Sequence, residues 1–162
     1  MPATVDPDIP QVLPSGSGTY FLWLRLGKPV DFRCGALGEV ALAEGWAGYA
    51  GSAFGPGGLA SRLRRHLGTP GRFHWHIDYL RREAPVAEFW FSNDRRRREH
   101  LWARDATELQ GASIPARGFG SSDCRCEGHL VHLPSAPRLT LFIRHLARHA
   151  PNHSALMRRV VG

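Results

Sequence analysis

Short apolar segments, separated by glycine and proline, run along most of this 162-residue chain. Residues 18–26 carry apolar side chains at both even and odd positions, which predicts a strand buried on both faces. Residues 46–52 predict a second strand, whose glycines and alanines allow another backbone or a ligand to approach closely. Turn residues separate two shorter predicted strands at 31–34 and 39–43.

The rest of the chain mixes predicted strands and helices. Residues 73–81 alternate between apolar and polar side chains, which predicts a half-buried strand with His74, His76 and Asp78 on its polar face. Further strands are predicted at 86–91 and 129–133, and helices at 58–67, 94–110 and 138–149, with Asn93 or Asp94 as N-cap of the middle helix. The last twelve residues are expected to form a frayed tail. This order predicts an α+β fold with a small mixed or antiparallel central sheet flanked by helices.

The amino-acid composition makes the protein strongly basic. The formal net charge is +7, and arginine carries nearly all of the positive charge because Lys28 is the only lysine. Arginine binds phosphate oxygens through parallel hydrogen bonds, which favours a nucleic-acid partner. Three cysteines do not suggest a disulfide scaffold and favour a reducing, cytoplasmic compartment. The chain has no run of about 18 apolar residues, so no membrane-spanning helix is expected.

A glycine-rich turn within residues 45–67 joins a predicted strand to a predicted helix. Gly55, Gly57 and Gly58 permit positive φ and close approach of a ligand. The N-terminus of the helix that follows offers unpaired N–H groups to an anion, and arginines on that helix add positive charge. The stretch therefore predicts a phosphate site, although an ordinary loop-to-helix junction has the same pattern.

The order of these motifs resembles the GIY-YIG nuclease superfamily. The triplets GTY (18–20) and YAG (49–51) stand in the places of its two signature triplets, with threonine and alanine where isoleucine is typical. The segments GYAGSAFGPGGLASRLRRH, HWHIDYL and GFGSSDCRCEGHL resemble its compact Uri-type branch, which is often known only as a domain of unknown function and is sometimes joined to endonuclease III. The resemblance covers residues 18–133, with a mobile arm expected at 1–17 and a helical extension at 134–162.

The resemblance implies an enzyme that hydrolyses phosphodiester bonds in DNA with the help of Mg²⁺ or Mn²⁺. The catalytic residues that it implies are Tyr20, Tyr49, Arg62 and Glu99. His66 joins this set because it lies one helical turn after Arg62 and shares its face. Glu99 is the implied metal ligand, with Glu88 and Glu108 as competing carboxylates. Substrate contacts are expected in the matching motifs at Gly51, Ser52, Arg65, His74, His76, Asp78, Ser122 and Asp123.

The chemistry of these residue types agrees with phosphodiester hydrolysis. A tyrosine, with a pKa near ~10, becomes a general base only where a neighbouring cation or a metal-bound water favours its phenolate. A helix arginine can grip a phosphate through two hydrogen bonds. One carboxylate suffices to hold a Mg²⁺ that keeps most of its waters.

Two alternatives stay open. The wider superfamily has an asparagine late in its sequence, and this chain has no clear match for it. A module that binds nucleic acid but does not cleave it therefore stays open as a second interpretation. Cys124, Cys126 and His129, or the pair His74 and His76, suggest structural zinc and hence a zinc-stabilised interaction domain. The arginine run 95–98 predicts a helix face that is solvated or follows a nucleic-acid backbone. An association with DNA-repair enzymes follows from the resemblance alone, and the sequence predicts no oligomeric state.

Overall fold

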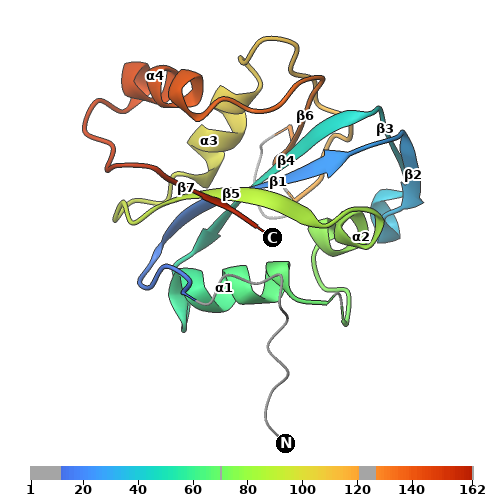
Figure 1. Cartoon of the computed structure of the whole chain (residues 1–162), viewed down its shortest axis with the longest axis horizontal. Coiled ribbons are helices and arrows are strands. Elements are labelled where there is room, and N and C mark those ends of the chain that lie inside the picture. The colour runs from blue at the N-terminus through green and yellow to red at the C-terminus, as the bar shows by residue number, and fades with distance from the viewer. Residues whose placement is uncertain (1–11, 70, 121–126, 162) are drawn as a thin grey trace, which may run out of the picture.

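The computed structural model describes residues 12–69, 71–120 and 127–161. Within these residues the chain forms a five-stranded sheet, a two-stranded hairpin and four α-helices, so the predicted α+β class is confirmed (Figure 1). The strands are β1 (Gly18–Leu26), β2 (Val30–Arg33), β3 (Glu39–Leu42), β4 (Gly45–Ala53), β5 (Val86–Ser92), β6 (Leu130–Leu133) and β7 (Met157–Val160). The helices are α1 (Gly58–Leu67), α2 (His76–Glu83), α3 (Glu99–Ala106) and α4 (Leu139–His149), and a 3₁₀ turn spans Gly35–Leu37.

The main sheet has the strand order β6-β4-β1-β5-β7, and every neighbouring pair is antiparallel. The central strand β1 is buried on both faces, as its apolar pattern predicts, with Leu22 on one face and Trp23 on the other. Gly48 pairs with Trp23, and a Cβ at Gly48 would overlap the rings of Trp23 and Phe21. The glycine content of β4 therefore makes room for aromatic packing across the centre of the sheet.

Helices cover both faces of this sheet. One core joins β1 to α1 and α2 through Leu63 and Leu80, and also includes the β2–β3 hairpin. The other core joins β1 to α3 and α4 through Trp102 and Phe142. Figure 1 shows α3 and α4 above the sheet and α1 below it. The sheet thus has a separate apolar core on each face, and these two cores hold β1 and β4 in place from both sides.

The prediction of a strand at 73–81 is wrong, because this segment contains the helix α2. The buried apolar side chains of α2 are Ile77 and Leu80, and Ala84 directly after the helix is also buried; these positions follow a helical spacing and not a spacing of two. Asp78 starts the helix by accepting hydrogen bonds at 2.8 Å from the backbone N–H groups of His74 and Trp75. A carboxylate that caps backbone donors favours a helix start where the aromatic alternation alone favours a strand.

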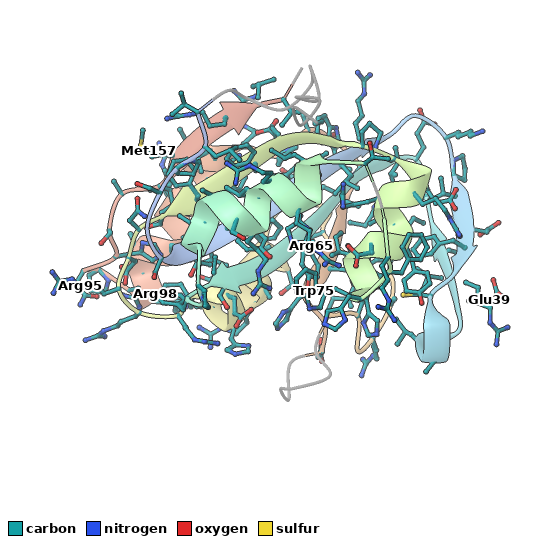
Figure 2. The ribbon with its side chains drawn as sticks, turned by 90° about the horizontal axis from the view of Figure 1, so that it is seen from below. Glu39, Arg65, Trp75, Arg95, Arg98 and Met157 are labelled. Atoms are coloured by element: carbon teal, nitrogen blue, oxygen red, sulfur yellow. The ribbon has the colours of Figure 1, made fainter. Side chains whose placement is uncertain are left out.

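The helix predicted to begin near Asn93 or Asp94 begins instead at Glu99. Asp94 closes a turn by accepting a hydrogen bond at 2.9 Å from the N–H of Arg96 and by pairing with Arg98 at 3.4 Å. The arginine run 95–98 is therefore a loop and not a helix face. Figure 2 shows Arg95 pointing away from the ribbon at one edge of the molecule, whereas Arg98 is buried.

The prediction of a frayed tail is wrong, because β7 pairs with β5 and completes one edge of the sheet, whereas the helix predicted at 138–149 is present as α4. Buried Glu88 on β5 accepts hydrogen bonds from Arg158 at 2.6 and 3.2 Å, which ties the last strand to the sheet. The four residues of β7 are all exposed, so no apolar pattern marks the strand in the sequence.

The described part of the predicted N-terminal arm, residues 12–17, is held against the domain. The carbonyl of Gly16 accepts a hydrogen bond at 2.8 Å from the N–H of Leu59, and Asn93 donates to the carbonyls of Ser15 and Ser17. In the ranges that the structure covers, no helix combines the length and the apolar character required to cross a membrane.

Candidate active site

The two motif tyrosines lie on one face of the sheet, on neighbouring strands. Tyr20 of β1 pairs directly with Gly51 of β4, and Tyr49 pairs with Leu22, two positions along. Since side chains two residues apart share a face of a strand, Tyr20 and Tyr49 are diagonal neighbours. Gly51 keeps this arrangement open, because a Cβ there would overlap the hydroxyl and ring of Tyr20.

Helix α1 packs over the two tyrosines and brings a cation and an imidazole to them. The hydroxyl of Tyr20 and Nε2 of His66 are hydrogen bonded at 2.9 Å, and both side chains are buried. Arg62, one turn before His66, lies close enough to lower the pKa of both tyrosines against the effect of burial. The Arg62 guanidinium lies 4.5 Å from the ring centre of Trp75, which holds it over the site.

Glu99 reaches the same place from the opposite side of the sheet, as the first residue of α3. Its Oε1 accepts a hydrogen bond at 2.9 Å from the hydroxyl of Ser52, which follows Gly51 at the end of β4. Its Oε2 lies 4.0 Å from Nδ1 of His129, a buried side chain. The carboxylate is thus oriented by β4 and by the residue before β6.

These side chains line a single polar cavity of about 310 Å³. The lining residues are Tyr20, Tyr49, Gly51, Ser52, Phe54, Gly55, Arg62, Trp75, Arg97, Glu99 and Gly120. Six of the residues predicted to be catalytic or to contact the substrate are therefore together: Tyr20, Tyr49, Gly51, Ser52, Arg62 and Glu99. Neither competing carboxylate lines the cavity: Glu88 pairs with Arg158, and Glu108 lies 3.5 Å from His145.

Burial keeps both phenols protonated at neutral pH. Burial raises the pKa of Tyr20 well above its usual value, and the neighbouring Tyr49 raises it further, while Arg62 opposes the shift only in part. Burial and then Glu99 likewise raise the pKa of Tyr49. A phenolate at rest is therefore not expected, and any transfer of a proton to Tyr20 requires the phenol to pass its own proton on.

His66 is the group to which Tyr20 is hydrogen bonded, and it is neutral. Burial lowers the pKa of His66 to about 3, with Arg81 lowering it further and Asp78 opposing the shift. Its Nδ1 is buried and has no hydrogen-bond partner among the described residues. A neutral imidazole beside Tyr20 can accept a hydrogen bond from the phenol through Nε2.

The dependence of the free energy of unfolding on pH should show that His66 is neutral in the folded protein. Between pH 6.5 and 3 the unfolded chain binds a proton at this histidine and the folded chain does not, so the free energy of unfolding falls as the pH falls. From pH 7 to pH 5 the expected loss from His66 is about 2 kcal/mol, taking an unfolded pKa of ~6.5. Urea unfolding at the two pH values should give a smaller loss for His66→Gln than for the wild type. The exposed His74 provides the control: if His74→Gln reduces the loss as much, His66 is not the buried neutral group.

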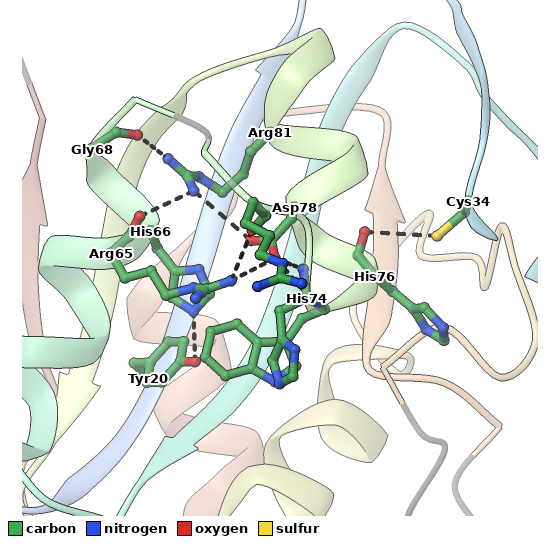
Figure 3. A network of polar contacts seen from close by, with 11 residues as sticks. Tyr20, Cys34, Arg65, His66, Gly68, His74, His76, Asp78 and Arg81 are labelled. Carbon is green, nitrogen blue, oxygen red and sulfur yellow. Dashed lines mark hydrogen bonds and ion pairs between the residues drawn. The ribbon is translucent and has the colours of Figure 1, made fainter.

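The other polar residues of α1 and α2 form a network beside the cavity (Figure 3). Arg65 donates to Asp78 at 2.9 Å, and buried Arg81 donates to the carbonyls of Arg65 and Gly68. Burial would raise the pKa of Asp78, but hydrogen bonds from two backbone N–H groups and from Arg65 lower it. Asp78 and Arg65, singled out as substrate contacts, thus join α1 to α2. None of this network's side chains lines the cavity.

The strand that would align His74 and His76 toward a shared metal ion is absent, because His76 begins the helix α2 and His74 precedes it. Nδ1 of His76 accepts a hydrogen bond at 2.8 Å from the N–H of Gly120, which fixes a wall of the cavity. His74 is exposed. Ser122, Asp123, Cys124 and Cys126 lie outside the described residues, so substrate contacts at 122–123 and zinc at the late cysteines stay predictions.

The donor set at the cavity fits a magnesium ion held by one carboxylate. Among the described residues no group of three or more His, Cys, Asp or Glu side chains is placed to hold a metal ion. The described residues therefore contain no cluster of protein side chains that could surround an ion. Among the described residues that line the cavity, Glu99 is the one that contributes an anionic oxygen. Mg²⁺ commonly takes one or two carboxylates and completes its octahedron with water and substrate phosphate. Glu99 would hold the ion in this way.

Sequence reasoning missed several residues that line the cavity. Trp75 lies in the segment for which a strand is predicted, and that prediction gives no reason for Arg62 and Arg65 to lie 4.5 and 4.1 Å from its ring centre. Phe54 carried no signal of its own. Arg97 was marked only as part of an arginine run, and its position at the cavity depends on the loop that Asp94 closes.

Comparison with known proteins agrees with the motif order. The family model described as "Domain of unknown function DUF123" matches residues 19–151, beyond the limit at 133 that the motifs suggest. No curated protein and no solved structure matches the chain. Because the family model covers most of the 162 residues, the chain belongs to the DUF123 family, which is a GIY-YIG-like family.

Proposed function

We propose that this protein is a metal-dependent endonuclease that hydrolyses phosphodiester bonds in DNA, and that it belongs to the Uri-type branch of the GIY-YIG superfamily. One observation carries the proposal: Tyr20, Tyr49, Arg62 and Glu99, from four different elements, line one polar cavity. A net charge of +7 supports a polyanionic substrate.

In the proposed reaction Arg62 grips the phosphate that is attacked. Its guanidinium is held by the Trp75 ring on one side and faces the cavity on the other, so it can donate two hydrogen bonds to phosphate oxygens. This contact stabilises the negative charge that grows on those oxygens in the transition state. A Mg²⁺ or Mn²⁺ bound at Glu99 would supply Lewis-acid stabilisation of the same charge.

Tyr20 and His66 form a hydrogen-bonded pair that is proposed to orient the attacking water. The Tyr20 hydroxyl accepts a hydrogen bond from the water and donates one to neutral Nε2 of His66, 2.9 Å away. Burial opposes both a free phenolate on Tyr20 and a protonated His66, so the proton that the water loses passes to solvent water and does not stay on either side chain. Tyr49 is the second phenol at the cavity and is proposed to orient a phosphate oxygen or the water by hydrogen bonding.

Supercoiled plasmid nicking tests this proposal. We expect the wild-type protein to nick the plasmid with Mg²⁺ and not with EDTA. A preparation carrying Tyr20→Phe, Arg62→Ala and Glu99→Gln together should be inactive with Mg²⁺, which excludes a contaminating nuclease. If the folded wild type binds DNA in a salt-dependent way but does not nick it with either metal, the binding-module alternative replaces the enzyme.

Two further proposals accompany the activity. Cys34, the cysteine that the structure describes, is a buried free thiol, which supports a reducing, cytoplasmic compartment. An association with DNA-repair enzymes is proposed from the resemblance to the Uri-type branch. Stoichiometric zinc in native protein, measured by elemental analysis, would instead support the zinc-stabilised interaction domain.

A further inference from the structure

Arg97 and Phe54 lie together at the cavity, outside the set of residues assigned to the reaction. Both line the cavity, and the Arg97 guanidinium lies 5.4 Å from the centre of the Phe54 ring. An arginine over an aromatic face is held in place while its N–H groups stay available to an anion. Among the described residues no carboxylate pairs with Arg97, in contrast to its neighbour Arg98, which pairs with Asp94.

The loop that carries Arg97 is anchored from several sides. Buried Asp94 accepts hydrogen bonds from the N–H groups of Arg96 at 2.9 Å and Ser154 at 2.8 Å. The N–H of Arg98 donates to the hydroxyl of Thr19 at 3.1 Å, beside Tyr20 on β1. The burial of Asp94 would raise its pKa, but these hydrogen bonds and Arg98 lower it to about 2, so the anchor stays ionised at neutral pH.

Because the loop is anchored in this way, the four consecutive arginines differ in their exposure to solvent. Arg98 is buried, whereas Arg95, Arg96 and Arg97 are exposed. Figure 2 shows Arg95 at one edge of the molecule, well separated from Arg65 and Trp75 near its middle. Exposed cations therefore follow one another along the 95–97 loop, from Arg97 at the cavity to Arg95 at the edge of the molecule.

A single phosphodiester at Glu99 and Arg62 would not need this second set of cations. A polymer with regularly spaced phosphates would, because the phosphates that flank the attacked one must leave the cavity along its walls. We propose that Arg97, held over Phe54, grips the phosphate next to the one attacked, and that Arg95 and Arg96 follow the same nucleic-acid strand outward. This inference rests on the proposed nuclease function and adds the path of the substrate strand.

Binding measured apart from cleavage tests this path. In Glu99→Gln protein without divalent ions, the affinity for a fluorescein-labelled DNA duplex is measured by anisotropy over a series of KCl concentrations. Adding Arg97→Ala should make the slope of log K against log[KCl] shallower by about 0.9, the value expected for one lost phosphate contact on duplex DNA. Arg144→Ala is the matched control, because it removes the same charge from an exposed position on α4.

Phe54→Leu removes the ring and leaves every charge in place. It should weaken DNA binding in the Glu99→Gln protein, and Phe54→Leu combined with Arg97→Ala should bind no more weakly than Arg97→Ala alone, because both act through one contact. Circular dichroism confirms that each variant is folded.

The outcomes separate this inference from the proposed function. If Arg97→Ala changes the slope no more than Arg144→Ala does, the strand path is wrong, while nicking by the wild type would still support the nuclease. If Arg97→Ala makes the slope shallower by about 0.9 but the wild type never nicks DNA, the strand path is supported and the protein is a binding module. If the Glu99→Gln protein shows no salt-dependent binding, the strand path is overturned.

Discussion

Glu99→Gln should reduce Mg²⁺-dependent plasmid nicking by about 10³-fold or more. A metal ion contributes several kcal/mol to the stabilisation of a phosphoryl transition state, and each 1.36 kcal/mol corresponds to about a factor of ten in rate. Glutamine retains a carbonyl oxygen that can accept the hydrogen bond from Ser52, so the variant should fold. The measurement is the initial nicking rate at saturating Mg²⁺, with equal folded protein confirmed by circular dichroism.

Glu108→Gln is the matched control for this variant. Glu108 follows the same helix and was a competing candidate for the metal, but it is exposed and lies beside His145, outside the cavity. Nicking by Glu108→Gln should therefore equal that of the wild type. Equal rates for Glu99→Gln and the wild type would remove Glu99 as the metal ligand.

Tyr20→Phe should lower the nicking rate by about 10²-fold, because the attacking water loses the hydroxyl that orients it. The substitution keeps the buried ring in its core and removes only the hydroxyl that is bonded to His66. The cost to folding should be about 1 kcal/mol, because a buried imidazole nitrogen loses its partner. The nicking rate and the urea midpoint, measured on the same preparation, separate the two effects.

Two other variants sharpen this prediction. Tyr79→Phe removes a phenol hydroxyl from α2, outside the cavity, and should leave nicking unchanged. Gly51→Ala keeps the Tyr20 hydroxyl but places a methyl group where it would overlap that hydroxyl, so it should also reduce nicking. Wild-type activity in Tyr20→Phe would show that the phenol takes no part in orienting the attacking water.

The predictions of β1, β4 and α1 are confirmed. Each of them rests on a local sequence pattern that is compatible with one type of secondary structure. Apolar residues at successive positions predict a strand buried on both faces, and β1 is such a strand. The glycine turn and amphipathic pattern after it predict α1, which begins at Gly58. Since Tyr20, Tyr49 and Arg62 lie on these three elements, the positions of three of the four residues that carry the proposal follow from the sequence once the motif order is recognised.

The segment 73–83 shows where the sequence pattern is ambiguous. Its aromatic residues alternate as in a strand, while Ile77 and Leu80 also have helical spacing, and local sequence alone does not decide between the two. The decision comes from Asp78, whose carboxylate caps the helix and pairs with Arg65 on another helix. That second contact exists only after α1 and α2 pack together.

The sequence by itself determined the central strands and the first helix, because burial period and turn chemistry act over a few residues. The motif tyrosines and arginine were identified through the resemblance of the motif order to a known family. Only the tertiary structure decided that Glu99, and neither Glu88 nor Glu108, faces the tyrosines. It also decided that β7 completes the sheet and that Arg97 borders the cavity. These outcomes depend on pairing between residues far apart in the chain, and a local pattern carries no information about which distant partner a polar side chain will meet.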